Sequence, residues 1–208
     1  MTVQPMSMEL VAPEEVGVDP RRLAVFLDRA KLDVDNGALP SVQVAVAAKG
    51  RLVAFETYGE ATNDKRYILQ SAGRNVVAAA LWKVLDDGLV KTDQCIAELI
   101  PEFGTNGKDV VTLEQVCTHT AGFPFAPLGY PKMLSRESRL EAFSKWRLDW
   151  EPGSRLQFHL TSQAWVIVEL VERLYDMAFA DFLRTQIFEP LGLGFILPLP
   201  ADRFDEVL

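Results

Sequence analysis

The sequence lacks the residues that several classes of protein require. Only Cys95 and Cys117 are present, which is too few for a disulfide framework, and their spacing fits neither a redox nor a zinc motif. Only His119 and His159 could offer imidazole to a transition metal, so such a site would have to rely on carboxylates, and we expect no metal. No stretch approaches the roughly 18 uninterrupted apolar residues of a membrane helix.

Basic residues are also scarce. Lysine and arginine total 21 against 29 aspartates and glutamates, which gives a net charge of −8. Contacts to phosphates need clustered basic side chains, so we expect no nucleic-acid partner. The first twenty residues contain neither a basic residue nor the apolar block of a secretory signal. This pattern predicts a cytoplasmic protein that does not bind a membrane.

The amino-terminal part predicts the beginning of an antiparallel sheet. Residues 42–47 and 52–58 are strand-like runs on either side of Lys49-Gly50, a pair that suits a tight hairpin turn. A hairpin of two strands is barely stable alone, and 195–197 is the one later segment that resembles a strand. The sheet is therefore expected to be completed either by a second chain, as in a homo-oligomer, or by further polypeptide of a larger protein.

Helices are expected over most of the remaining sequence. Apolar residues recur at helical spacing over 21–34, 72–87, 136–145, 161–175 and 178–188, and Thr112 to Gln115 has the form of a capping box. Prolines and glycines predict a loop over 123–132, of the kind that often borders a site. We expect an α/β part over 1–90, which carries the hairpin and the helix at 72–87, and a mainly helical part over 91–208.

Ser71-Ala72-Gly73-Arg74 has the form of a Ser-x-x-Lys nucleophile motif in which arginine replaces the lysine. A lysine one helical turn from the serine is a leading candidate for the base that activates the hydroxyl. Arginine keeps its proton at physiological pH, so Arg74 can orient a group or bind an anion but cannot act as that base. The alternative interpretations are a serine that caps the helix and an arginine held in a surface ion pair.

Five segments, in order, resemble the serine β-lactamase and penicillin-binding-protein superfamily, specifically its class C-like branch of esterases, β-lactamases and peptidases. They are the hairpin at 42–58, the Ser71 motif with its helix, and the segments 112–122, 150–154 and 188–192. The resemblance implies an α+β, β-lactamase/transpeptidase-like fold in which a helix-rich region packs on an antiparallel sheet. That sheet is incomplete here, so 1–208 is expected to be the amino-terminal portion of one such domain.

The resemblance also implies roles for particular positions. In that family the serine is acylated, the lysine lowers its proton affinity, and a tyrosine of a Tyr-x-Asn-like motif assists proton transfer. Ser71 matches the serine, Arg74 stands at the lysine position, and Phe158 stands where the tyrosine belongs. The family's later Lys-Thr-Gly or His-x-Gly strand does not occur. His119 to Gly122 matches an earlier structural turn instead, so a structural role is favoured for His119.

His159 is the one residue near the replaced tyrosine that titrates close to neutral pH, so it is our candidate base, together with Ser71 as the catalytic nucleophile. The alternative is a structural histidine that caps the following helix. Arg74, Tyr130 and Phe158 are the candidate substrate-binding residues. Arg74 suits a substrate carboxylate, and Tyr130 lies in the proline-rich loop.

The sequence therefore predicts a β-lactamase-related serine hydrolase that acts on a small-molecule ester or amide through an acyl-Ser71 ester, without a cofactor. Because two proton-handling positions are replaced, the first alternative is a non-catalytic relative whose cleft binds a ligand or a protein. The second alternative is an assembly module completed by a second chain.

Overall fold

The computed structural model describes residues 9–194 and 197–208. The chain divides into two compact units, one formed by the chain up to Leu69 together with Phe188–Leu208, the other by Gln70–Ile187. This division differs from the expected one near position 90, because the helix that follows Ser71 belongs to the same unit as the later helices and packs against one of them. We describe each unit by itself.

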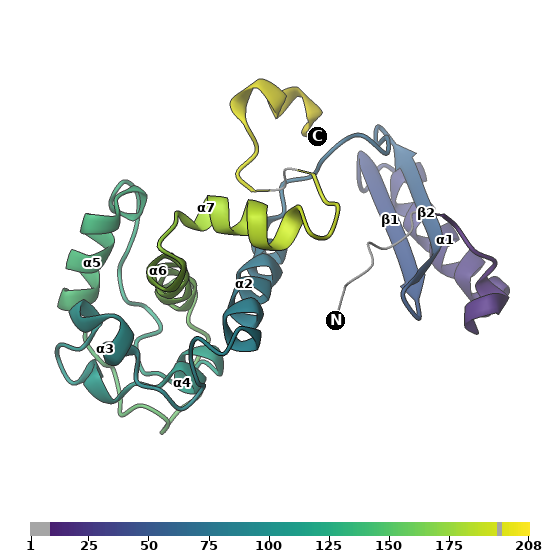
Figure 1. The fold of residues 1–208 in the computed structure, drawn as a ribbon. Helices are drawn as coiled ribbons and strands as arrows, with labels where there is room; N and C mark the ends of the chain where they lie inside the picture. The colour runs from purple at the N-terminus through teal and green to yellow at the C-terminus, as the bar shows by residue number, and fades with distance from the viewer. Residues whose placement is uncertain (1–8, 195–196) are drawn as a thin grey trace. The chain divides into compact units, whose positions relative to one another are not determined.

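The first unit contains a short 3₁₀ helix (Pro13–Val16), helix α1 (Pro20–Asp35) and a hairpin of strands β1 (Ser41–Ala48) and β2 (Arg51–Gly59), which α1 contacts (Figure 1). The Asp19 carboxylate caps α1 by accepting the backbone N–H of Arg21 at 2.8 Å. At the hairpin turn, Lys49 and Gly50 both have positive φ, 49° and 73°, as a type I′ turn requires. The expected helix and hairpin are both confirmed.

The sheet contains two antiparallel strands within the described residues, with Ser41 opposite Gly59 and a register irregularity at Val46/Ala47. The strand expected over 195–197 falls mostly on Phe195 and Ile196, which lie outside the described residues. In the carboxyl-terminal segment, the 3₁₀ helix η7 (Ala201–Glu206) lies beside Arg66. The Arg66 N–H donates to the carbonyl of Glu206 at 2.7 Å.

The second unit is helical, and α6 runs through its core. Its helices are α2 (Arg74–Asp86), α3 (Ile96–Leu99), α4 (Leu113–Cys117), α5 (Arg136–Lys145), α6 (Ser162–Tyr175) and α7 (Phe179–Phe182). The apolar stripe of α6 is buried as its spacing predicts, and α2 packs against it. The capping box is present at α4, where the Thr112 hydroxyl accepts the Gln115 N–H at 3.3 Å. Beyond α7 the expected single helix continues as a π-helix over Leu183–Phe188.

Four aromatic rings form the centre of the helical unit. Phe103 meets Phe123 edge to face at a centroid distance of 5.4 Å, and Phe123 stacks on Trp146 at 5.7 Å. Phe143 packs on Trp146 at 4.6 Å. All four side chains are buried, so this cluster anchors both the loop after α4 and the segment after α5.

Lys108 is buried in this unit although it carries a charge. Its ammonium donates to the carbonyls of Thr105 and Trp146, each at 2.6 Å, and to the Thr105 hydroxyl at 3.2 Å. Burial lowers the pKa of Lys108 to about 8, so the side chain is still protonated at pH 7. The three donors of the ammonium are thus matched by three oxygen atoms that tie two loops together.

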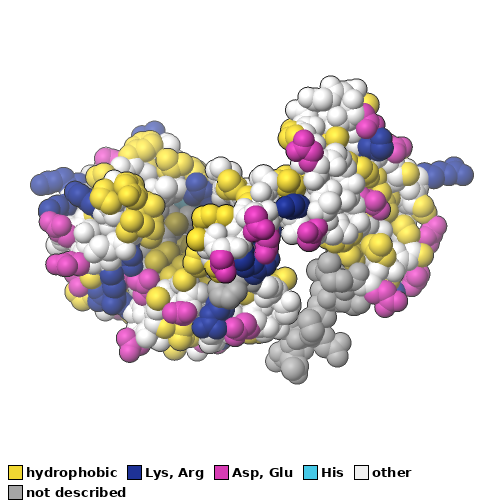
Figure 2. Space-filling model, turned by 90° about the horizontal axis from the view of Figure 1, so that it is seen from above, with side chains coloured by type: hydrophobic (Ala, Val, Ile, Leu, Met, Phe, Trp, Pro, Cys, Tyr) yellow, Lys and Arg dark blue, Asp and Glu magenta, His cyan; other side chains and the backbone are white. Residues whose placement is uncertain are grey.

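On the face seen in Figure 2, acidic and basic side chains are interspersed, with apolar side chains between them. Among the helices of the described residues, none combines the length and the apolar character needed to cross a membrane.

Candidate functional site

Ser71 lies in a short 3₁₀ helix, η2 (Gln70–Gly73), that leads directly into α2. The predicted helix start at position 72 is therefore wrong by two residues. Ser71 is exposed, and its hydroxyl has no hydrogen-bond partner in the described part of the chain. The N-cap of α2 is Gly73, so the alternative in which Ser71 caps the helix does not hold. Gln70, immediately before it, has a φ of 48°, a strained value for a residue with a side chain.

Arg74 is the first residue of α2 and is half-buried. Its Nη1 donates to the carbonyl of Leu160 at 2.5 Å, and its guanidinium carbon lies 5.0 Å from the centre of the Phe158 ring. The ring covers one face of the guanidinium in a cation–π contact. The two positions at which the sequence departs from the family pattern are therefore in direct contact.

His119 also packs against Phe158. The two rings lie 4.9 Å apart, and the Nδ1 atom of His119 accepts the backbone N–H of His159 at 3.2 Å. The carbonyl of His119 accepts the N–H of Gln157 at 3.0 Å. Burial, with a smaller contribution from the charge of Arg74, lowers the pKa of His119. These contacts match the structural role favoured for this residue.

The geometry of His159 does not support the role of base that we expected for it. The side chain is fully buried, its Nε2 accepts the N–H of Phe123 at 3.2 Å, and its Nδ1 donates to the carbonyl of Gln157 at 2.7 Å. Both ring nitrogens are therefore engaged with backbone, and burial lowers the pKa of His159. The ring joins the loop after α4 to the segment before α6, so it is a structural histidine, although it does not cap α6 as the alternative had it.

The remaining candidate residues differ in their surroundings. Phe158 is 46% exposed and lies under Arg74, whereas Tyr130 is 80% exposed and has no hydrogen bond or ring contact among the described residues. The structure thus places Phe158 against Arg74, three residues after Ser71, whereas it shows no hydrogen bond or ring contact of Tyr130 with these residues. The sequence could not exclude Tyr130 from the site, because the conformation of a loop rich in proline and glycine cannot be predicted from its sequence.

No acidic side chain of the described residues lies within ion-pair distance of Arg74. The sequence offers Asp149, Glu151 and Glu114 as acids that could neutralise it, and none of them forms an ion pair with it among the described residues. The other arginines of this unit that are not exposed, Arg139, Arg173 and Arg184, each have a carboxylate partner. Arg74 is therefore a half-buried cation whose charge is compensated only by a carbonyl and a ring.

A cavity of about 180 Å³ adjoins Arg74 between α2, α4 and α6. Its walls are largely apolar, with Val77 and Leu81 from α2 and Ile167 from α6, and Gln163 contributes an amide. Sequence analysis missed this cavity. The available signal was a pair of alanines, Ala78 and Ala164, on the facing helices, where small side chains leave space.

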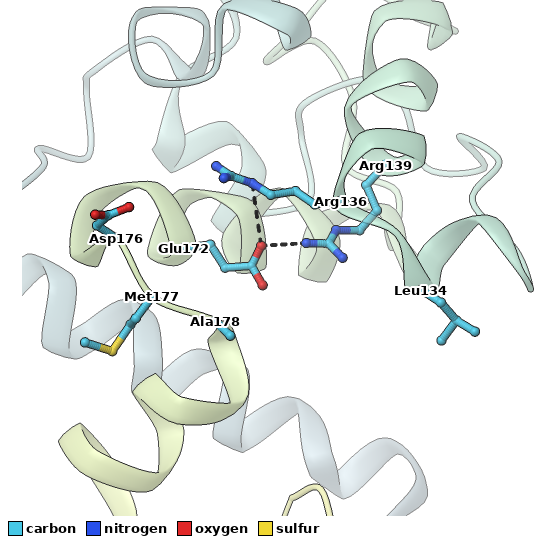
Figure 3. A pocket seen from close by; sticks show the side chains of 7 residues that line it. All are labelled: Leu134, Arg136, Arg139, Glu172, Asp176, Met177 and Ala178. Atoms are coloured by element: carbon cyan, nitrogen blue, oxygen red, sulfur yellow. Dashed lines mark hydrogen bonds and ion pairs between the residues drawn. The ribbon is translucent and has the colours of Figure 1, made fainter.

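A second cavity of about 410 Å³ lies between α5 and the end of α6, and its two arginines are already paired with Glu172. Figure 3 shows the Glu172 carboxylate between Arg136 and Arg139; the latter donates to it at 2.5 Å. Behind it, the buried Glu169 carboxylate accepts from Arg136 at 2.8 Å and from Arg173 at 2.6 Å. This network joins α5 to α6, and it leaves little charge for a ligand.

A metal centre has no candidate in the described ranges 9–194 and 197–208, where no group of three histidine, cysteine or carboxylate side chains converges. The chemistry available near Ser71 is therefore that of a hydroxyl, a guanidinium and two backbone segments.

Comparison with known proteins places these features in context. The family model described as Beta-lactamase matches residues 26–195. A protein of Salmonella enteritidis named as a D-alanyl-D-alanine carboxypeptidase is 24% identical over 218 residues, and the alignment covers 89% of this chain and 49% of that protein. A Salmonella agona protein of the same name is 25% identical over 214 residues, covering 88% and 48%. The chain spans about half the length of the curated relatives it matches.

Solved structures resemble the chain in fold. A penicillin-binding protein homolog from Caulobacter crescentus superposes with a TM-score of 0.81 at 26% identity, covering 92% of this chain and 54% of that one. A family VIII carboxylesterase superposes with a TM-score of 0.78 at 20% identity, covering 96% and 56%.

Proposed function

Because the chain belongs to the β-lactamase family, we propose that it is part of a serine hydrolase in which Ser71 accepts the acyl group of a small ester or amide. The observation that carries this proposal is the position of Ser71 on an exposed turn that leads directly into α2, beside the paired Arg74 and Phe158. The fold is the α+β, β-lactamase/transpeptidase-like fold expected from the sequence, and the chain holds a part of it.

In the proposed reaction the Ser71 oxygen attacks the carbonyl carbon of the substrate. The alcohol or amine of the substrate leaves with a proton, and Ser71 retains the acyl group as an ester. Water then hydrolyses this ester, which releases a carboxylic acid and restores the hydroxyl. The backbone N–H of Ser71 precedes α2. The family resemblance implies that it donates a hydrogen bond to the developing oxyanion.

The proton of Ser71 has no strong acceptor among the side chains described around it. Arg74 remains protonated, Phe158 has no hydroxyl, and His159 has both nitrogens engaged. We therefore propose slow acylation, with solvent as the acceptor, and assign Arg74 and Phe158 to substrate binding.

The non-catalytic alternative is favoured by the same contacts. A guanidinium that stacks on a phenyl ring and donates to a carbonyl forms a stable binding surface without any proton transfer. In this proposal the protein binds a ligand or a protein partner at the start of α2, and Ser71 has no chemical role.

The assembly alternative rests on the two-stranded sheet of the first unit. A second chain, for example in a homo-oligomer, would pair with the edge of β1 or β2 and extend that sheet. Light scattering on the isolated chain tests this proposal, because a stable monomer across a range of concentrations would reject it.

A fluorophosphonate probe separates hydrolase from binding module, since it labels serines that react as nucleophiles. We expect stoichiometric labelling of the folded chain, loss of labelling in Ser71→Ala, and full labelling in the control Ser138→Ala, which alters a serine on α5. Absence of labelling in well-folded protein would reject the hydrolase and leave the binding module.

A further inference from the structure

Arg74 and the adjoining cavity together form a site with two chemically different parts. Arg74 is the charged residue on the lining of the cavity between α2 and α6, and its guanidinium would supply the polar part. The apolar part is the wall formed by Val77, Leu81 and Ile167. We propose that this site binds a carboxylate whose attached apolar group is about the size of a phenyl ring.

The charge of Arg74 favours an anionic ligand. Only its Nη1 has a hydrogen-bond partner in the described chain, the carbonyl of Leu160, so Nε and Nη2 retain donors for a carboxylate. One face of the guanidinium is already covered by Phe158, which removes water from that side and holds the side chain in place. A carboxylate would supply the negative charge that no described side chain supplies.

The size of the cavity limits the group attached to the carboxylate. An apolar cavity of roughly 150 Å³ accommodates a molecule the size of benzene. The cavity beside Arg74, at about 180 Å³, thus has room for a phenyl ring or a branched alkyl group of similar volume. The Gln163 amide does not serve the ligand through its nitrogen, because Nε2 donates to the carbonyls of Val116 and Cys117 at 2.9 and 3.2 Å.

The lining contains no group that would repel an anion at neutral pH. Cys117 is the one lining residue that could become negative, and burial raises the pKa of its thiol to about 11. The thiol is therefore neutral and adds to the apolar wall. This distinguishes the site from the larger cavity at α5, where Glu172 and Asp176 line the wall beside the arginines.

Equilibrium binding tests the site without requiring Ser71 to react. We would titrate the 208-residue chain carrying Ser71→Ala with benzoate and with benzamide, a neutral compound of the same shape, and follow binding by NMR. We expect benzoate to bind at least about tenfold more tightly than benzamide, because a charge-assisted hydrogen bond contributes at least that factor. Equal affinity for the two compounds, or no saturable binding of benzoate, would overturn the proposal.

Variants assign the two parts of the site. Arg74→Gln should weaken benzoate about tenfold or more and leave benzamide unchanged, whereas Ala78→Phe, which fills the cavity, should weaken both compounds. Arg147→Gln, at an exposed arginine outside the cavity, is the matched control and should bind benzoate as the parent does. Unchanged benzoate affinity in either site variant would contradict the proposal. If a variant does not fold, the affinities of benzoate and benzamide for the parent chain still test the proposal.

This inference and the proposed hydrolase can fail separately. Fluorophosphonate labelling without benzoate binding would keep Ser71 as the nucleophile and remove the carboxylate site. Benzoate binding without labelling would keep the site and identify the protein as a binding module.

Discussion

The guanidinium carbon of Arg74 lies 5.0 Å from the centre of the Phe158 ring, and the same arginine donates to the carbonyl of Leu160. These are the positions at which the resemblance places a lysine and a tyrosine. A lysine and a tyrosine there could exchange a proton, whereas a guanidinium stays protonated and a phenyl ring has no proton to give or take. In this chain the pair is thus a cation–π pair and not a proton-handling pair, and this determines what can be expected of Ser71.

Restoring the pair should activate Ser71. In Arg74→Lys/Phe158→Tyr, an amine and a phenol return to the site, and we expect fluorophosphonate labelling to be about 100-fold faster, the lower range of general acid–base catalysis. Each single substitution should gain less, because the two groups act as a unit. The measurement is the labelling rate by mass spectrometry. A double variant no faster than the parent would argue against this account of the pair, and the same double variant with Ser71→Ala is the control.

Removing the ammonium of Lys108 should destabilise the protein. Lys108→Met keeps the length of the side chain but removes the ammonium, so the carbonyls of Thr105 and Trp146 keep one donor each, the Lys108 backbone N–H and the Asn106 amide. We expect a loss of about 1–3 kcal/mol in the free energy of unfolding, because the hydrogen bonds of the buried ammonium are lost. Urea unfolding measures this loss. The control, Lys145→Met, alters an exposed lysine and should change stability by less than about 0.5 kcal/mol. Equal stabilities of the two variants would be the contrary result.

The two histidines should make stability depend on pH. Burial lowers the pKa of His159, and burial together with the charge of Arg74 lowers the pKa of His119. Both side chains therefore stay neutral in the folded chain when the pH falls just below about 6.5, the ordinary pKa of a histidine. The unfolded chain binds these protons first, so the free energy of unfolding should fall as the pH drops from 7.5 to 5.5. Most carboxylates do not titrate in this window.

The variant His159→Gln checks this pH dependence. It removes one of the two titrating groups, so urea unfolding at several pH values should give a shallower slope for the variant, even though its stability is lower throughout. Identical slopes for the variant and the parent would show that His159 does not contribute.

The Glu169 carboxylate should be sensitive to loss of its charge. It is fully buried and accepts hydrogen bonds from Arg136 and Arg173, so Glu169→Gln would leave two guanidinium groups without their shared counterion. Arg173 keeps the Glu102 carboxylate at 2.6 Å and Arg136 keeps Glu172 at 3.9 Å, so the cost should be smaller than the about 3–5 kcal/mol of a buried charge left without any partner. Thermal unfolding should therefore show a lower midpoint for Glu169→Gln than for Glu141→Gln, whose parent carboxylate is exposed on α5. Similar midpoints would mean that the network is not stabilising.

The elements that the sequence predicted well are those set by local signals. The hairpin follows from Lys49-Gly50 between two strand-like runs, and α1 follows from Asp19 and Pro20 before an apolar stripe. The boundaries of α5 were also predicted correctly. The family resemblance, which rested on the order of five segments, is confirmed by the match over residues 26–195.

The features that the sequence did not predict depend on contacts between distant segments. His159 is a structural histidine because its ring accepts the N–H of Phe123, which is 36 residues away. Nothing in the sequence around Phe123 predicts this hydrogen bond. The start of α2 was misplaced because helical periodicity cannot distinguish a 3₁₀ turn from the first turn of an α-helix. The cavity beside Arg74 arises where small residues of two helices face each other, which periodicity alone does not show.

The ion pairs that join α5 to α6 have a consequence for behaviour at high temperature. Three arginines and three glutamates meet there, Arg136, Arg139, Arg173, Glu102, Glu169 and Glu172. The hydration of charged groups becomes less favourable on heating, so the penalty for keeping them out of water declines while apolar stabilisation levels off. The ion pairs between α5 and α6 should therefore contribute a larger fraction of the stability of the helical unit as the temperature rises.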